Sequence, residues 1–207
     1  MKTQIFQSPK NETPEHFLLK NVALAYLRTN LNCNIASTEV SSMYDHHNNT
    51  SGGEIKSHRC IADAVGIKIK DQWLPLAKRL DPNEFYKRIE TVCCIEVKIS
   101  KADFMSGYCV GGDLNYIMAP VGVINKDDLY KGVGLLEVDF SELSFIGWQI
   151  HGVNVSKKPS RFKRDIDRSL QVYRIYQSIA TQLTLNSIRN NPWFYPGYQS
   201  ESSAREG

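Results

Sequence analysis

The spacing of apolar residues predicts a helix near each end of the chain and strands between them. Apolar side chains recur at intervals of three and four over residues 17–31, directly after Thr13, Pro14 and Glu15, which together favour a helix start. The same interval returns over residues 159–188. Apolar runs between them predict strands at 35–43, 58–69, 92–99, 114–119 and 132–138.

The segments between these elements are polar or mixed in character. We expect a polar loop over 45–53, a partly helical stretch over 74–89, a short helix or loop over 101–108 and a hairpin arm over 145–155. Residues 1–12 are predicted to form a flexible arm and 190–207 a flexible tail, so 13–189 makes one domain that includes the basic C-terminal helix. The order of elements predicts an α/β fold, a central mixed β-sheet flanked by helices.

The composition indicates the compartment of the protein more clearly than its activity. The 207 residues are 42% hydrophobic and 23% charged, and the formal net charge of +3 does not by itself point to nucleic acid. The N-terminus has no apolar signal-peptide segment, and no apolar run is long enough to cross a membrane. Five cysteines without a Cys-x-x-Cys pair favour reduced thiols, and we expect a cytoplasmic protein with no membrane partner.

A zinc site is an alternative use of the residues around the polar loop. His46, His47, His58 and Cys60 lie close together in the sequence, but their spacing matches no standard zinc template. A polar loop with exposed histidines is the favoured interpretation.

The most informative stretch is the apolar run that contains Glu96 and Lys98. In a strand these two side chains project from one face, while Ile95, Val97 and Ile99 point into a core. A carboxylate and an ammonium group on a largely buried strand are costly unless they have partners or a task. Such a pair therefore marks a candidate site.

A second carboxylate, Asp63 on the preceding predicted strand, completes a set suited to phosphodiester hydrolysis. Magnesium takes hard oxygen ligands and keeps several waters, so Asp63, Glu96 and the carbonyl of Val97 are enough to hold Mg²⁺ or Mn²⁺. Lys98 would orient the attacking water or stabilise charge on the phosphate. The alternatives remain that Asp63 satisfies backbone amides at a strand end and that Glu96 and Lys98 form an exposed ion pair.

Four ordered pieces of the chain resemble the PD-(D/E)xK nuclease superfamily, and within it the MmcB-type DNA-repair proteins. They are residues 59–66 (RCIADAVG), 94–104 (CIEVKISKADF), 113–122 (DLNYIMAPVG) and 132–139 (GVGLLEVD), and the similarity covers roughly 14–155. The resemblance implies a restriction-endonuclease-like core. It also implies metal and catalytic positions at Asp63, Glu96 and Lys98.

The same resemblance assigns roles to residues around that set. Glu39 matches an acidic residue often found on the preceding strand, and Glu15 is a candidate for a helix carboxylate, although the helix dipole already explains a Glu there. Asp103 is expected to cap the following helix or pair with Arg59. Ser100 and Lys101 are placed to touch the phosphate. Cys60 departs from the family, where a second Arg is common, and so does the long insertion between Asp63 and Glu96.

The C-terminal helix outside the resemblance is a candidate for nucleic-acid binding. Residues 157–174 hold seven Lys and Arg against two Asp, a net +5 that suits a phosphate backbone. A helix packed on the sheet with a solvated basic face explains the charges equally well. The aromatic tail residues are able to stack on bases or anchor the tail (Trp193, Phe194, Tyr195, Tyr198).

Taken over the whole chain, the candidate contacts with nucleic acid are Arg59, Ser100, Lys101, Lys157, Lys158, Arg161, Lys163 and Arg164.

These features together predict a Mg²⁺-dependent endonuclease acting on nucleic acid, with DNA as the expected substrate and repair or mobile-element processing as its setting. A homodimer is compatible with the resemblance. The alternative is a module of the same fold that binds nucleic acid or a protein without cleaving it. A third possibility is a structural protein in which Glu96 and Lys98 serve only stability.

Overall fold

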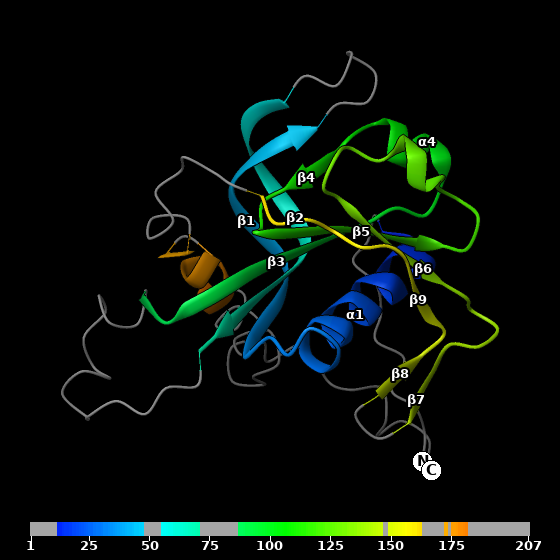
Figure 1. Cartoon of the computed structure of the whole chain (residues 1–207), viewed down its shortest axis with the longest axis horizontal. Helices are drawn as coiled ribbons and strands as arrows, with labels where there is room; N and C mark the ends of the chain where they lie inside the picture. Colours follow the sequence, from blue (N-terminus) through cyan, green and yellow to red (C-terminus); the bar gives the residue numbers. More distant parts are fainter. Residues whose placement is uncertain are drawn as a thin grey trace, which may run out of the picture.

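The described part of the chain folds around one twisted sheet. A computed structural model describes residues 12–47, 55–70, 87–146, 149–162, 172–173 and 175–181, and for 41–47 and 55–60 it describes the backbone alone. The elements, shown in Figure 1, are α1 (Pro14–Thr29), β1 (Ile35–His47), β2 (Ile55–Ile69), β3 (Ile89–Val97), α4 (Lys101–Met105), β4 (Tyr108–Val110), β5 (Leu114–Pro120), the 3-10 helix η1 (Lys126–Asp128), β6 (Gly134–Val138), β7 (Ser144–Ile146), β8 (Gln149–His151) and β9 (Val153–Lys157).

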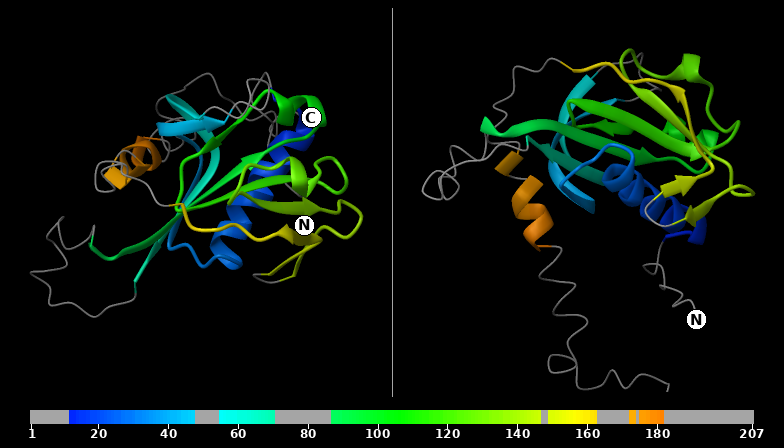
Figure 2. Two further views of the ribbon diagram at one scale, coloured as in Figure 1. Left: turned by 45° about the horizontal axis from the view of Figure 1, so that its top comes forward. Right: turned by 60° about the horizontal axis from the view of Figure 1, so that its bottom comes forward.

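Seven of the strands form a mixed sheet in the order β4-β1-β2-β3-β5-β6-β9. Strands β1, β2 and β3 run antiparallel in sequence, whereas β3, β5 and β6 are parallel to one another. The parallel crossover from β3 to β5 carries α4 and β4, and β4 pairs with the far end of β1. Figure 2 shows the long β1–β2 hairpin curving away from the β3–β5–β6 part of the sheet. The α/β class with a mixed central sheet is therefore confirmed.

Helix α1 packs against one face of this sheet and is correctly predicted at its start. The Thr13 side chain accepts a hydrogen bond from the backbone N–H of His16 at 3.2 Å, and Pro14 occupies the first turn. The buried face of the helix, which includes Leu19, Val22 and Leu27, packs on residues of β2, β3, β5 and β6. This packing fixes the position of every polar side chain on the same helix.

The other face of the sheet is covered by two further groups. Residues 172–173 and 175–181 are helical, and Val172, Ile175 and Ile179 join a buried cluster with β2 and β3. Phe104 of α4 and Tyr108 stack with ring centroids 5.5 Å apart in a third cluster. The described part of the C-terminal helix thus packs on the sheet, as one of the two interpretations of that segment requires. No helix in the described ranges is long and apolar enough to cross a membrane.

Several element boundaries differ from the sequence prediction. Strand β1 continues through residues 45–47, which were expected to be loop, because that end pairs with β2 and β4. Strand β3 begins at Ile89 rather than at residue 92. The expected hairpin arm divides, because β7 pairs with β8 while β9 joins the edge of the main sheet. Residues 74–86 of the predicted partly helical stretch 74–89 lie outside the described residues, as do the arm before residue 12 and the tail after 189.

The cysteine pattern favoured reduced thiols, and Cys109 departs from that expectation. Cys33, Cys93 and Cys94 are buried thiols, whereas Cys109 is disulfide-bonded. The pairing of β4 with β1 carries Cys109 to the hairpin, where its Sγ lies 3.9 Å from the carbonyl oxygen of Ile61 on β2. Strand β4 is too short to stand out in the sequence, so this approach could not be foreseen.

The close contact between α1 and β2 gives a first stability prediction. A Cβ added to Gly66 would lie 2.6 Å from Cys33 Sγ and 3.0 Å from Leu27 Cδ2. We expect Gly66→Ala to lower the free energy of unfolding by about 1–3 kcal/mol through overpacking, measured by urea denaturation. Adding Cys33→Ala should recover part of the loss, and equal losses with and without it would contradict the steric cause.

Candidate metal and catalytic site

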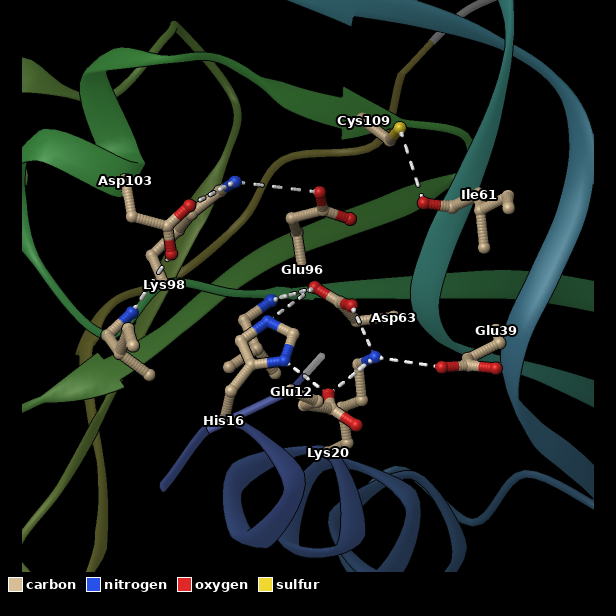
Figure 3. A network of polar contacts seen from close by, with 12 residues as sticks. Glu12, His16, Lys20, Glu39, Ile61, Asp63, Glu96, Lys98, Asp103 and Cys109 are labelled. Atoms are coloured by element: carbon tan, nitrogen blue, oxygen red, sulfur yellow. Dashed lines mark hydrogen bonds and ion pairs between the residues drawn. The ribbon is translucent and has the colours of Figure 1, made fainter. Parts of the chain in front are cut away.

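The candidate site lies where strands β2 and β3 separate. Their ladder runs from the Ile69–Ile89 pair to the Ala64–Ile95 pair and stops there. At the next position Asp63 Oδ2 accepts the backbone N–H of Val97 at 2.8 Å, so a hydrogen bond to a side chain replaces the backbone pairing of the two strands. The carboxylate of Asp63 is thereby held against the main chain between Glu96 and Lys98 (Figure 3).

Glu96 and Lys98 project from the same side of β3, as the alternating pattern predicts. Lys98 Nζ lies 3.8 Å from Glu96 Oε1, and the two side chains are only 8–9% exposed. Ile95 and Val97 point to the other side, into the cluster under α1. The interpretation of Glu96 and Lys98 as an exposed ion pair is therefore wrong.

Asp103 completes the surroundings of Lys98. Its Oδ1 lies 3.3 Å from Lys98 Nζ, and its Oδ2 accepts the backbone N–H of Ile99 at 3.2 Å. Ser100 caps α4 by accepting the N–H of Asp103 at 3.1 Å. The start of α4 thus orients one carboxylate toward Lys98, which fixes the ammonium group between Glu96 and Asp103.

Glu39 lies opposite Asp63 and has an unusual backbone. It falls between the Thr38–Ala64 and Val40–Ala62 pairs of the β1–β2 ladder, and its φ is +54°. A left-handed conformation costs a non-glycine residue roughly 1–2 kcal/mol. Strained residues of this kind persist where the surrounding structure demands them, often at functional sites. The position of Glu39 beside Asp63 agrees with its predicted place at the site.

Lys20 of α1 is a site residue that the sequence analysis missed. Its Nζ lies 2.7 Å from Glu12 Oε1, 3.1 Å from Glu39 Oε1 and 3.4 Å from Asp63 Oδ1. Burial acts to lower the pKa of Lys20, but the hydrogen bond with Glu12 and the charges of Asp63 and Glu39 outweigh it and raise the pKa. Lys20 therefore stays an ammonium ion, and it ties α1 to β1 and β2.

His16 on α1 and Glu12, which precedes the helix, extend the same network. His16 Nδ1 pairs with Glu12 Oε1, and His16 Nε2 lies 3.8 Å from Asp63 Oδ2. His16 and Lys20 are four residues apart, which aligns them on one face of α1, and this spacing was the available signal. Glu15, the residue considered for a helix carboxylate, is exposed and outside this network; Glu12 lies in it instead.

A cavity of about 500 Å³ opens beside these side chains. It lies between the start of α1, β1 and the turn into α4. Its lining residues are Glu12, Thr13, His16, Lys20, Glu39, Ile99, Ser100 and Asp103. A ligand in this cavity would meet the carboxylates of Glu12, Glu39 and Asp103 and the ammonium group of Lys20, whereas Asp63 and Glu96 do not line it.

The buried carboxyl group of Glu96 fits a cation. Burial, and next the charge of Asp63, raise the pKa of Glu96 to about 8, although Lys98 opposes the shift. Its Oε2 is buried and has no hydrogen-bond partner among the described residues. No three His, Cys, Asp or Glu side chains in the described ranges are grouped to hold a metal by themselves. A divalent ion would therefore need Asp63, Glu96, the Val97 carbonyl and water.

The charges of the site also call for cations. Glu12, Glu39, Asp63, Glu96 and Asp103 face the ammonium groups of Lys20 and Lys98. With Glu96 protonated below its raised pKa of about 8, the four other carboxylates against the two ammonium groups leave a net charge of −2, with His16 not counted. A phosphate group would be repelled by this charge, so its approach requires bound cations.

The structure does not gather the predicted nucleic-acid contacts around the site. Arg161 lies at the opposite end of β3, where its guanidinium contacts the Glu90 carbonyl and Thr91 Oγ1. Lys101 pairs with Asp128. Lys157 on the edge strand donates to the Lys126 carbonyl at 3.0 Å, and Lys158 is exposed. Of the predicted set, Ser100 lines the cavity, while Lys163, Arg164 and the side chain of Arg59 lie outside the described residues.

The raised pKa of Glu96 predicts a pH dependence of stability. A carboxyl with a higher pKa in the folded state binds its proton more tightly there, so stability falls as the pH rises from about 4.5 toward 8. In metal-free buffer we expect Glu96→Gln to exceed wild type in unfolding free energy by ~2 kcal/mol at pH 9 and by less at pH 5, measured by urea denaturation. Glu90→Gln on the same strand is the control and should show no such trend.

Comparison of the chain with models of known families, with curated proteins and with solved structures gave no match in any of the three.

Proposed function

We propose that this chain is a metal-dependent nuclease that hydrolyses phosphodiester bonds in DNA, on a restriction-endonuclease-like core. The observation that carries the proposal is the meeting of Asp63, Glu96 and Lys98 at the opening between β2 and β3, with the main chain of Val97 bound to Asp63. Asp63 lies on β2 and Glu96 on β3, and Lys98 directly follows the end of β3. The DNA-repair setting follows only from the resemblance of the four sequence pieces to MmcB-type proteins.

Each residue has a distinct role in this proposal. Asp63, Glu96 and the Val97 carbonyl hold Mg²⁺ or Mn²⁺, which when bound polarises the phosphate and lowers the pKa of a water molecule. Lys98 is held by Glu96 and Asp103 at 3.8 and 3.3 Å, so its donors are already oriented for a phosphate oxygen or the attacking water. Glu39 orients Lys20 and, through it, Asp63.

A nicking assay tests the proposal. Supercoiled plasmid and single-stranded DNA are incubated with the protein and millimolar Mg²⁺ or Mn²⁺, and with EDTA as a control. We expect cleavage by wild type that EDTA abolishes, and a loss of about 10²–10³-fold in Lys98→Met, because the donor to the developing charge is removed. Lys68→Met, which removes a half-exposed lysine paired with Glu90 on the same sheet, is the matched control.

One observation favours a second candidate, a binding module that does not cleave. The Lys20 ammonium group lies 3.4 Å from Asp63 Oδ1 and already neutralises part of the charge that a metal would neutralise. DNA binding without cleavage, unaffected by Asp63→Asn, would favour this module over the nuclease. Cleavage that depends on Lys98 would exclude it.

A further inference from the structure

Two buried thiols meet under the C-terminal end of α1. Cys33 lies in the turn between α1 and β1, and Cys93 lies on β3. Both belong to the buried cluster between α1 and the sheet, where each residue is 2% exposed. The two thiols share a hydrogen bond. Neither takes part in the proposed nuclease site.

Gly66 on β2 makes the contact between the two thiols possible. It pairs directly with Cys93 in the β2–β3 ladder. Side chains of directly paired residues project from the same face of a sheet, with Cβ atoms about 4.5–5.5 Å apart. A Cβ at Gly66 would lie 2.6 Å from Cys33 Sγ. The Cys33 thiol therefore occupies the place of the missing side chain, beside Cys93.

The surroundings of the two thiols give them different reactivity. The hydrogen bond with Cys93, together with the charges of Arg28 and Lys68, lowers the pKa of Cys33 despite its burial. The same hydrogen bond, together with burial, raises the pKa of Cys93. Since the thiolate is the nucleophile, Cys33 is the thiol that attacks first and Cys93 the one that keeps its proton.

The position of Cys33 in a turn gives a small oxidant a route to the pair. Its neighbours Asn32 and Asn34 are exposed. A short opening of this turn would therefore uncover the Cys33 thiol, whereas Cys93 lies in the middle of β3 beneath it. The geometry thus gives the same order of reaction as the charges, with Cys33 before Cys93.

We propose that Cys33 and Cys93 form a redox-sensitive thiol pair, which hydrogen peroxide converts to a disulfide that fastens the end of α1 to β3. The Cys33 sulfur attacks one peroxide oxygen and the O–O bond breaks, which leaves Cys33 as a sulfenic acid. The departing hydroxide takes the proton of the Cys33 thiol and becomes water. The Cys93 sulfur then attacks the Cys33 sulfur, the S–O bond breaks and the S–S bond forms. The hydroxyl group leaves as a second water with the Cys93 proton.

Mapping the thiols by mass spectrometry tests the proposal. The full chain is treated with hydrogen peroxide, its remaining thiols are alkylated in denaturant, and its peptides are compared with those of untreated protein. We expect a peptide pair joined between Cys33 and Cys93 that dithiothreitol separates. Because the bond constrains the unfolded chain, the melting temperature of the treated protein should rise by about 5–10 °C.

Two variants separate this pair from the other cysteines. Cys94→Ala is the matched control, because Cys94 is also buried but lies in the cluster on the opposite face of β3. It should form the bond and gain stability as wild type does, whereas Cys33→Ala should do neither. The map of wild type decides the proposal even if a variant fails to fold. Separate alkylation of Cys33 and Cys93 after peroxide treatment, or a bond from Cys93 to a different cysteine, would overturn the proposal.

Discussion

Replacing Asp63 by Asn is expected to lower the rate of DNA cleavage by at least ~10²-fold while the protein stays folded. In the proposed nuclease the carboxylate of Asp63 would be a metal ligand, and its charge acts on Glu96 and Lys20. Asn keeps an oxygen that accepts the Val97 N–H, the 2.8 Å bond that joins β2 to β3 at the site. The substitution therefore removes the charge with little change in shape. Plasmid nicking with Mg²⁺ measures the rate.

Asp113 offers a closely matched control for this change. Its Oδ2 accepts the N–H of Val92 at 2.8 Å, the same kind of bond at the other end of the same strand. Asp113→Asn should keep wild-type cleavage and similar stability. Equal cleavage by Asp63→Asn and wild type would contradict the role given to Asp63.

Replacing Lys20 by Met is expected to cost about 3–5 kcal/mol of the free energy of unfolding in metal-free buffer. The substitution removes the positive partner of Glu12, Glu39 and Asp63 and leaves three negative charges close together, two of them on side chains only 10% and 14% exposed (Glu12 and Asp63). The long apolar stem is preserved, so the loss reports the charge and not the packing. Urea denaturation in the presence of EDTA measures it.

Lys68→Met sets the scale for a lysine in an ordinary ion pair. Lys68 Nζ lies 3.9 Å from Glu90 Oε1, and the two side chains are 38% and 41% exposed. Its removal should cost no more than about 1 kcal/mol. A Lys20→Met variant as stable as Lys68→Met would show that the three carboxylates do not depend on Lys20.

The sequence predicted the strand residues of the site because strand geometry leaves few alternatives. A period of two places Glu96 and Lys98 on one face whatever the tertiary fold, and the apolar residues between them show which face is buried. The prediction that Asp63 lies near Glu96 and Lys98 required their strands to be neighbours in the sheet, and β2 does pair with β3. The core strands and the start of α1 were predictable for the same local reasons.

The sequence did not show that polar side chains of α1 belong to the site. Lys20 and His16 are common on the polar face of any amphipathic helix, and only the packing of α1 turns them toward Asp63. The sequence does not reveal the left-handed backbone of Glu39, because the residue there is not the glycine that usually adopts this conformation. Charge counting made Arg161 a candidate nucleic-acid contact, and the fold carries it to the start of β3, where it binds the Glu90 carbonyl.

The most direct test of the account is a calorimetric titration of wild-type protein with Mg²⁺, beside Asp63→Asn under the same conditions. The account predicts saturable binding of one ion per chain to wild type and no binding to Asp63→Asn. The absence of binding to wild type up to millimolar Mg²⁺, or equal binding to the two proteins, would contradict it.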